Sequence, residues 1–127
     1  MNQVTLSEIE WQIMQVIWEK GVLSVKEVWQ TLYPDGEKAY TTIQTYMDRM
    51  VEKDLLAKQK IGLVNFYHAR IDKKSLVRHA TENLVSRAFN GSFVGLAAFL
   101  VESPNLSKDD LEKIKALIKK KEEEQHG

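Results

Sequence analysis

The 127-residue sequence contains no cysteine, which excludes disulfide bonds, thiolate metal sites and cysteine nucleophiles. Its three histidines, His68, His79 and His126, are widely spaced, so we expect no metal site. No apolar run approaches the roughly 20 residues that span a bilayer, and the N-terminus lacks the cationic and apolar segments of a secretory signal. We therefore expect a cytoplasmic protein with no membrane insertion.

The patterns that mark common enzymes are absent as well. The sequence has no Ser/His/Asp cluster, no HExxH spacing of metal ligands and no glycine-rich phosphate loop. His68 and His79 fit ordinary surface or packing positions better than catalytic ones. We expect neither enzymatic activity nor a cofactor.

Net charge gives no signal either, because 18 basic and 18 acidic residues cancel and composition alone does not indicate a nucleic-acid partner. Residues 1–72 hold 8 Lys and Arg against 10 Asp and Glu. One local bias exists, since residues 56–71 contain Lys58, Lys60 and Arg70 and no acid. What the chain does have is 43% hydrophobic residues, enough to bury a core without covalent cross-links.

Two helices are predicted in the first third of the chain. Thr5–Glu8 and Ser7–Glu10 both have capping-box spacing, so the first helix could start at either pair. Apolar residues then recur at helical spacing until Gly21 ends the run. A second capping box, Ser24–Glu27, begins a short helix that ends before the turn residues 34–36.

A third helix is predicted over Ala39–Asp54, with one apolar face and one polar but mostly uncharged face. Two short strands follow, Leu55–Lys60 and Phe66–Ile71, joined by the loop Ile61–Asn65. Three helices followed by a hairpin are the element order of a winged helix-turn-helix, in which a two- to three-stranded hairpin forms the wing.

Helical spacing returns after Asp72. We expect one helix closed by Asn90-Gly91, a short and strongly apolar helix capped by Ser92, and a last helix that starts at Ser107 and frays over residues 119–124.

The fold class we predict is mainly α, with a winged helix-turn-helix domain over residues 1–72 and a helical dimerisation domain over residues 73–127. The tail cannot bury all its apolar stripes against itself, and apolar burial contributes roughly 25 cal/mol per Å², so a twofold partner would stabilise it. We expect the dimer contacts to be made by Leu76, Leu84, Phe89, Phe93, Leu96, Phe99, Leu100, Leu111, Ile114, Leu117 and Ile118.

The third predicted helix has the properties of a DNA-reading element. An α-helix fits the major groove, where its outward face must carry hydrogen-bonding groups such as Thr42, Thr45, Tyr46 and Arg49. Arg49 can chelate a guanine or clamp a phosphate. A merely solvated face is the alternative, but such faces usually carry Lys and Glu, whereas threonines and tyrosines cost helix propensity. We favour DNA reading.

The predicted wing adds basic residues beside this helix. Lys58 and Lys60 alternate on one face of the first strand and could straddle a phosphate or enter a minor groove. An ordinary edge strand that uses lysine to block aggregation is the alternative. Their placement beside the third helix favours DNA contact.

With the segments laid out, Leu6–Met14, Val16–Trp18 and Thr41–Thr45 resemble the penicillinase and methicillin-resistance repressor family, the BlaI/MecI type with its copper-responsive CopY branch. The resemblance covers nearly the whole chain. It includes the opening Ser-x-x-Glu-Trp-x-x-Met-x-x-x-Trp, the form Thr-x-x-Thr-x-x-x-Arg in the third helix, and a lysine-rich wing that ends in Phe66-Tyr67.

The resemblance implies a homodimeric repressor that binds double-stranded operator DNA at a palindrome with TACA/TGTA half-sites. In the family, third-helix positions that match Thr41, Thr42, Thr45 and Arg49 touch DNA, and the C-terminal tail makes the dimer. The full set of expected DNA contacts is Thr41, Thr42, Thr45, Tyr46, Arg49, Lys53, Lys58 and Lys60.

Two departures concern the inducing signal. Copper-sensing members end in paired Cys-x-Cys motifs, which this cysteine-free chain lacks. Members that answer β-lactams are cut by a membrane sensor protease at an Asn-Phe bond in the C-terminal region. Alignment by Leu96 and Leu106 puts Phe99-Leu100 there instead, which makes these two residues a candidate cleavage site and a membrane sensor protease a candidate partner.

A second hypothesis remains from a different functional class. The winged helix could be a protein-interaction module whose threonine-rich face docks a protein, and the near-zero net charge favours this slightly.

Overall fold

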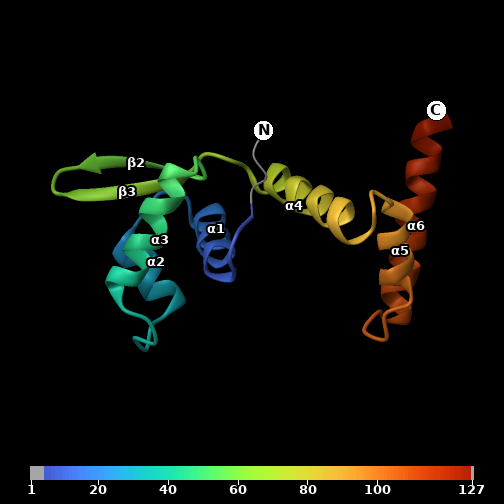
Figure 1. Ribbon diagram of the computed structural model, residues 1–127, viewed down its shortest axis with the longest axis horizontal. Coiled ribbons are helices and arrows are strands. Elements are labelled where there is room, and N and C mark those ends of the chain that lie inside the picture. The colour runs from blue at the N-terminus through green and yellow to red at the C-terminus, as the bar shows by residue number, and fades with distance from the viewer. Residues whose placement is uncertain (1–4, 127) are drawn as a thin grey trace. The chain divides into compact units, whose positions relative to one another are not determined.

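The computed structural model describes residues 5–126 and forms two compact units, residues 1–81 (the N-terminal unit) and residues 82–127 (the C-terminal unit). Six helices and three strands follow one another in these described residues (Figure 1). The mainly α fold class is confirmed. We placed the domain boundary after Asp72, but the compact units divide between Thr81 and Glu82, inside helix α4 (Lys73–Ala88).

Helix α1 (Glu8–Lys20) begins at a complete capping box. The Ser7 hydroxyl oxygen accepts a hydrogen bond from the Glu10 backbone N–H at 3.3 Å, and the Glu10 carboxylate accepts one from the Ser7 N–H at 2.8 Å. Of the two starts predicted, Ser7–Glu10 is therefore the one that forms. Gly21 ends the helix with φ +92°, a conformation that glycine adopts without steric cost.

Helix α2 (Val25–Leu32) repeats this design at Ser24 and Glu27, as predicted. Helix α3 (Tyr40–Glu52) starts after Ala39 without a side-chain cap and ends before Asp54, whose φ of 63° cannot continue a right-handed helix. The predicted range Ala39–Asp54 was slightly too long at both ends.

A three-stranded antiparallel sheet completes the N-terminal unit, in the order β1-β3-β2. Strands β2 (Leu56–Ile61) and β3 (Val64–Ala69) form the wing, and β1 (Leu23–Ser24) pairs with Phe66 and Tyr67 in the middle of β3. The predicted loop Ile61–Asn65 was wrong, because Ile61 and Val64 pair directly and the turn contains only two residues. The wing projects from the unit near the C-terminal end of α3 (Figure 1).

One apolar core holds α1, α2, α3, the sheet and the start of α4 together. Ile13, Ile43, Met47 and Tyr67 are buried at its centre, and Leu76 of α4 joins them with no exposed surface. This burial explains why the first turns of α4 belong to the N-terminal unit. It also corrects our inclusion of Leu76 among the dimer contacts, since its side chain offers no surface to a second chain.

The C-terminal unit contains the end of α4, helix α5 (Phe93–Val101) and helix α6 (Lys108–His126). As predicted, Asn90-Gly91 closes α4, with φ of 51° and 83°, and the Ser92 hydroxyl caps α5. The capping box of Ser107 and Asp110 starts α6. The fraying predicted over residues 119–124 was wrong, because α6 continues to His126.

Candidate nucleic-acid interface

Helix α3 presents a polar face away from the core. Ile43, Met47 and Met50 face inward with no exposed surface, whereas Thr42, Thr45 and Arg49 are exposed. Residues three and four apart share a face of a helix, so these three exposed side chains form one stripe, and exposed Thr41 lies beside it. No ion pair involves Arg49 among the described residues, so its guanidinium can donate to a ligand.

The hydroxyl of Thr45 is already engaged within the helix. It donates to the Thr41 carbonyl oxygen at 2.9 Å, one turn earlier. Thr45 therefore presents its methyl group and an acceptor lone pair to the outside, rather than a free donor. A methyl group at this place suits contact with a thymine methyl, whereas a donor to phosphate must come from another residue of the stripe.

Tyr46 and Lys53, which we also expect to contact DNA, make contacts within the protein. Tyr46 is half-buried and packs on the apolar core, so packing limits what it can offer to a ligand. Lys53 follows the last residue of α3, and its ammonium group lies 2.8 Å from the carboxylate of Glu10 in α1. The contact that Lys53 makes within the protein is an ion pair, and its contact with DNA stays a prediction.

The Glu10 carboxylate explains why this ion pair exists. Glu10 is buried, with 4% of its surface exposed, and it also accepts the Ser7 N–H of the α1 cap. Burial by itself raises the pKa of Glu10, but the hydrogen bonds from Lys53 and Ser7 and the charge of Lys53 outweigh it and hold the pKa below its usual value. Glu10 is thus ionised at neutral pH, and Lys53 balances its charge.

The wing lysines lie on the face of β2 that turns toward α3. Lys58 is opposite buried Tyr67 in the β2–β3 register, and Lys60 is opposite Asn65. The Lys58 ammonium group lies 3.6 Å from Asp48 of α3, so part of its charge is balanced within the protein. Lys60 is exposed and makes no ion pair among the described residues, which leaves it the more available of the two.

Asp48 links the wing to α3 by a second contact. The Tyr67 hydroxyl donates to the Asp48 carboxylate at 2.9 Å. Burial, together with this hydrogen bond and the charge of Asp48, raises the pKa of Tyr67 far above its ordinary value, so the phenol stays protonated and keeps donating. This contact fixes the root of the wing against α3.

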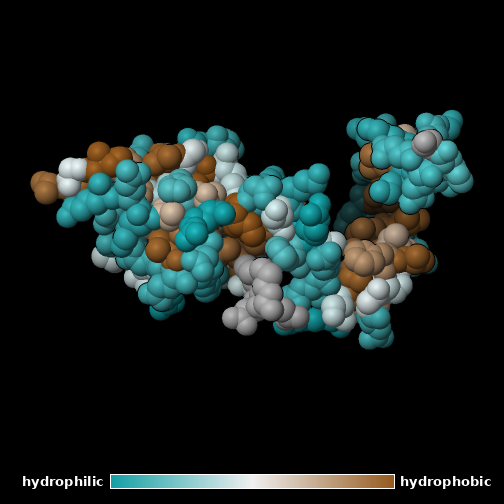
Figure 2. Space-filling model, turned by 90° about the horizontal axis from the view of Figure 1, so that it is seen from above, coloured by the Kyte–Doolittle hydropathy of each residue, from teal (hydrophilic) through white to brown (hydrophobic). Residues whose placement is uncertain are grey.

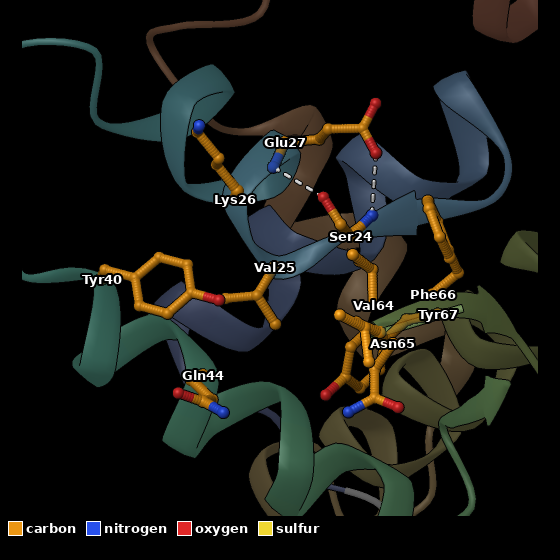
Figure 3. Close-up of a pocket in the computed structure, with 11 residues that line it drawn as sticks. Ser24, Val25, Lys26, Glu27, Tyr40, Gln44, Val64, Asn65, Phe66 and Tyr67 are labelled. Atoms are coloured by element: carbon orange, nitrogen blue, oxygen red, sulfur yellow. Dashed lines mark hydrogen bonds between the residues drawn. The ribbon is translucent and has the colours of Figure 1, made fainter. Parts of the chain in front are cut away.

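A cleft of about 530 Å³ separates α3 from the outer part of the wing (Figure 3). Tyr40 and Gln44 of α3 form one wall, Val64 and Asn65 of β3 form another, and Lys26 lies at the start of α2. Sequence reasoning missed all of these as interface residues. Gln44 had a usable signal, because it sits one residue from Thr45 in a polar helix segment, but Lys26 and Asn65 join the cleft only through the tertiary fold.

The C-terminal unit has an unusually large exposed apolar surface, and Figure 2 shows brown side chains gathered on its helices. Neither α5 nor α6 contains a buried residue. Of the predicted dimer contacts in this unit, some are half-buried and some exposed. The half-buried ones are Phe89, Leu96, Leu111 and Ile114. The exposed ones are Leu84, Phe93, Phe99, Leu100, Leu117 and Ile118.

The candidate cleavage residues lie in α5. Phe99 and Leu100 are both exposed, and the Phe99 ring packs edge-on against Phe89 with the ring centroids 6.0 Å apart. Both residues are helical, so the chain would have to unwind locally before an extended-chain protease could bind it.

Within the described residues, no single helix has the length and apolarity of a membrane span, and only the bent pair α4 and α5 reaches them together.

The structure of the described residues has three parts: a three-helix unit with a small sheet, a polar helix face beside a basic hairpin, and an apolar helical tail. These parts are those of a winged-helix protein.

Comparison with known proteins identifies the family. The family model described as penicillinase repressor matches residues 6–120, so the chain belongs to the penicillinase repressor family. It is 23% identical over 116 residues to the methicillin resistance regulatory protein MecI of Mammaliicoccus sciuri, covering 91% of this chain and 94% of the relative. It is 25% identical over 113 residues to the penicillinase repressor of Bacillus licheniformis, covering 89% and 88%.

The resemblance drawn from the sequence is thereby confirmed, and the family is one of repressors, not enzymes. Among solved structures, the chain is similar to a MarR family protein from Bacillus stearothermophilus, with 21% identity and a TM-score of 0.49, covering 98% of this chain and 78% of the other.

Proposed function

We propose that two copies of this chain form a homodimer that represses transcription in the cytoplasm by binding a palindromic operator with TACA/TGTA half-sites. The observation that carries the proposal is the exposed stripe of Thr42, Thr45 and Arg49 on a helix held rigidly by the core. The half-site sequence is the one that the family resemblance implies. Bound at a promoter, the dimer would exclude other proteins from the same DNA.

The dimer is supported by the exposed apolar residues of the C-terminal unit. Phe99, Leu117 and Ile118 each expose more than half of their surface, which is unfavourable in water. A standard interface buries about 800 Å² per partner, and apolar burial contributes roughly 25 cal/mol per Å². We propose that a second copy of the chain covers these residues, because it exposes the same apolar side chains and buries them in the same contact.

A dimer would also compensate for the absence of net positive charge, which leaves each unit only weakly attracted to DNA. In each N-terminal unit, Lys53 and Lys58 lie beside acids and so offer only part of their charge to DNA. Tethering makes the second contact effectively intramolecular and can raise avidity about 10²- to 10⁴-fold without any new contact. Two such units would read half-sites about 34 Å apart, one turn of DNA.

The direct test is a fluorescence titration of the chain on a TACA/TGTA palindrome, on the same duplex with one half-site scrambled, and at several salt concentrations. We expect the scrambled duplex to bind at least about tenfold more weakly and all affinities to fall as salt rises. Equal affinity for both duplexes, or binding that ignores salt, would refute sequence-specific DNA binding.

For release, we propose proteolysis of the C-terminal unit at or near Phe99-Leu100, with a membrane sensor protease as the partner. Exposure of both residues supports access, and separation of α5 from α6 would destroy the surface that we assign to the dimer. Direct copper sensing through paired cysteines is impossible in a chain without cysteine. Mass spectrometry of the repressor after induction tests this proposal. If the operator is released while the chain is still intact, the proposal is contradicted.

The alternative function, a protein-docking winged helix, is favoured only by the zero net charge. A pull-down with the intact chain separates the two functions. A protein partner that is retained after nuclease treatment, combined with no preference for the palindrome, would support docking.

A further inference from the structure

The tip of the wing is apolar, although nothing in the described part of the N-terminal unit covers it. Leu63 in the turn exposes 94% of its surface, and its neighbours Ile61 and Val64 expose 55% and 47%. Figure 2 shows this as brown atoms at the free end of the hairpin, among the teal of the N-terminal unit. An exposed cluster of this kind at the end of a projecting hairpin indicates a contact with another molecule.

The turn itself does not require leucine. Gly62 has φ +65°, whereas Leu63 is not among the residues with positive φ, a pattern that fits a two-residue turn with glycine in the first central position. The second central position of such a turn accepts polar residues such as Asn and Ser. An exposed leucine here costs hydration free energy and gives the fold no packing in return.

The cleft beside the tip places the wing relative to DNA. If α3 lies in the major groove, the phosphate strand that borders this groove runs between α3 and the wing. The cleft found there is lined by Lys26, Gln44 and Asn65, which can donate to phosphate and sugar, and by Glu27, whose carboxylate accepts the Ser24 N–H in the α2 cap (Figure 3). Leu63 and Val64 form the far wall of the same cleft. The tip then lies over the next groove, which is the minor groove.

The length of the wing agrees with this placement. Each wing strand has six residues, and at roughly 3.3 Å per residue the hairpin reaches about 20 Å. Adjacent major and minor grooves are separated by about half of the 34 Å helical repeat, or about 17 Å. The hairpin is therefore long enough to reach the minor groove while its root stays beside α3.

The charge around the tip favours DNA over a protein partner. Of the three basic residues in 56–71, Lys58 and Arg70 lie beside Asp48 and Asp54. Lys60 makes no ion pair among the described residues and directly precedes Ile61 of the apolar cluster, opposite Asn65. A polyanion is attracted by such a hairpin, whereas an apolar protein surface gains nothing from the uncompensated lysine. Apolar side chains flanked by basic ones are the means by which proteins wedge between base steps in the minor groove.

We propose that Leu63 enters the minor groove beside each half-site and wedges against a base step, bending the operator. This inference rests on the proposed operator binding. It adds a contact whose contribution to affinity depends on how easily the DNA sequence bends. Specificity would then extend to base pairs that α3 does not touch. Flexible pyrimidine–purine steps at the position of the tip would be preferred.

The test compares Leu63→Ser with the parent chain and with Val22→Ser, which removes another exposed aliphatic residue just after α1, outside the wing. Affinity is measured on the palindrome, and bending by energy transfer between dyes at the two ends of the same duplex. We expect Leu63→Ser to bind about five- to tenfold more weakly and to bend the duplex less, with its preference for the intact half-site unchanged. Val22→Ser should match the parent.

The outcomes separate this inference from the proposed function. If the parent discriminates the palindrome but Leu63→Ser binds and bends it equally well, the wedge is refuted and operator binding stands. If the parent shows no preference for the palindrome, both are refuted. If Leu63→Ser keeps full DNA binding and instead loses a protein partner of the parent, the tip is a protein-docking surface and the wedge is likewise refuted.

Discussion

The two units of this chain treat their apolar residues in opposite ways. The N-terminal unit buries Ile13, Met47, Tyr67 and others in a single core, while α5 and α6 of the C-terminal unit contain no buried residue at all. The first has a buried core of its own. The second has capped helices, but apart from Val85 its apolar residues stay exposed or half-buried in a single chain, which agrees with the proposed contacts to a second copy. The difference agrees with the proposal that the N-terminal unit recognises DNA and the C-terminal unit self-associates.

Helix α4 contains both behaviours and offers the sharpest comparison. Leu76 has no exposed surface, whereas Leu84, two turns later, is 47% exposed. We expect Leu76→Ala to destabilise the N-terminal unit by about 2–5 kcal/mol. Leu84→Ala should change the unfolding of that unit by less than about 0.5 kcal/mol and weaken self-association instead. Urea unfolding, followed by tryptophan fluorescence of the N-terminal unit at low and high protein concentration, distinguishes these effects.

Within the N-terminal unit, Arg49 tests whether the exposed α3 stripe acts independently of the core. Arg49→Ala should lower operator affinity by about 1–3 kcal/mol, because it removes one bidentate or phosphate contact per half-site, while the unfolding free energy stays within about 0.5 kcal/mol. The measurement pairs an operator titration with urea unfolding. A variant that unfolds or fails to self-associate would show that Arg49 supports the structure.

The Glu10–Lys53 ion pair should behave in the opposite way to Arg49, because it contributes to the stability of the fold. Lys53→Ala leaves a buried carboxylate without its partner and should cost about 1–2 kcal/mol at pH 7, a figure reduced because Lys53 is half exposed. Since the folded pKa of Glu10 is lowered, its stabilising effect is present above the unfolded pKa and is lost as pH falls through the folded pKa. The difference between variant and parent should therefore shrink in acid. A difference that stays constant from neutral pH down to about pH 3 would contradict this.

The two threonines of the α3 stripe give the smallest expected effect. Thr45 already donates its hydroxyl to Thr41, so Thr45→Val keeps the methyl surface and should change operator affinity less than about threefold. Thr42 makes no such intrahelical bond among the described residues, and Thr42→Val should weaken binding several-fold more. Titration of both variants on one duplex is the check, and the reverse order would mean that Thr45 donates to DNA.

Local features of this molecule could be predicted from sequence because their causes are local. The caps at Ser7, Ser24 and Ser107 need residues only three positions apart, and the polar stripe of α3 follows from helical spacing. The family resemblance rests on the same segments. Such features follow from neighbouring residues alone and need no knowledge of the tertiary fold.

The remaining features depend on contacts between distant residues. Lys53 pairs with Glu10 across 43 positions, and Tyr46 is drawn against the core by its neighbours, so neither role can be read from spacing on one helix. The wing turn was placed wrongly because Gly62 and Asn65 both tolerate positive φ, and only strand pairing decides between them. Lys26 and Asn65 likewise join the cleft only once β3 lies beside α2.

We propose that the C-terminal unit buries its exposed apolar residues against a second copy and thereby pairs two reading helices. Sedimentation and operator titration of Leu117→Asp test it most directly, with Lys119→Asp as a matched change on the opposite face of α6. We predict that the parent and Lys119→Asp are dimers that bind two chains per palindrome. Leu117→Asp should be a folded monomer with operator affinity at least about 100-fold lower. A dimeric Leu117→Asp, or a monomer with the parent's affinity, would contradict the account.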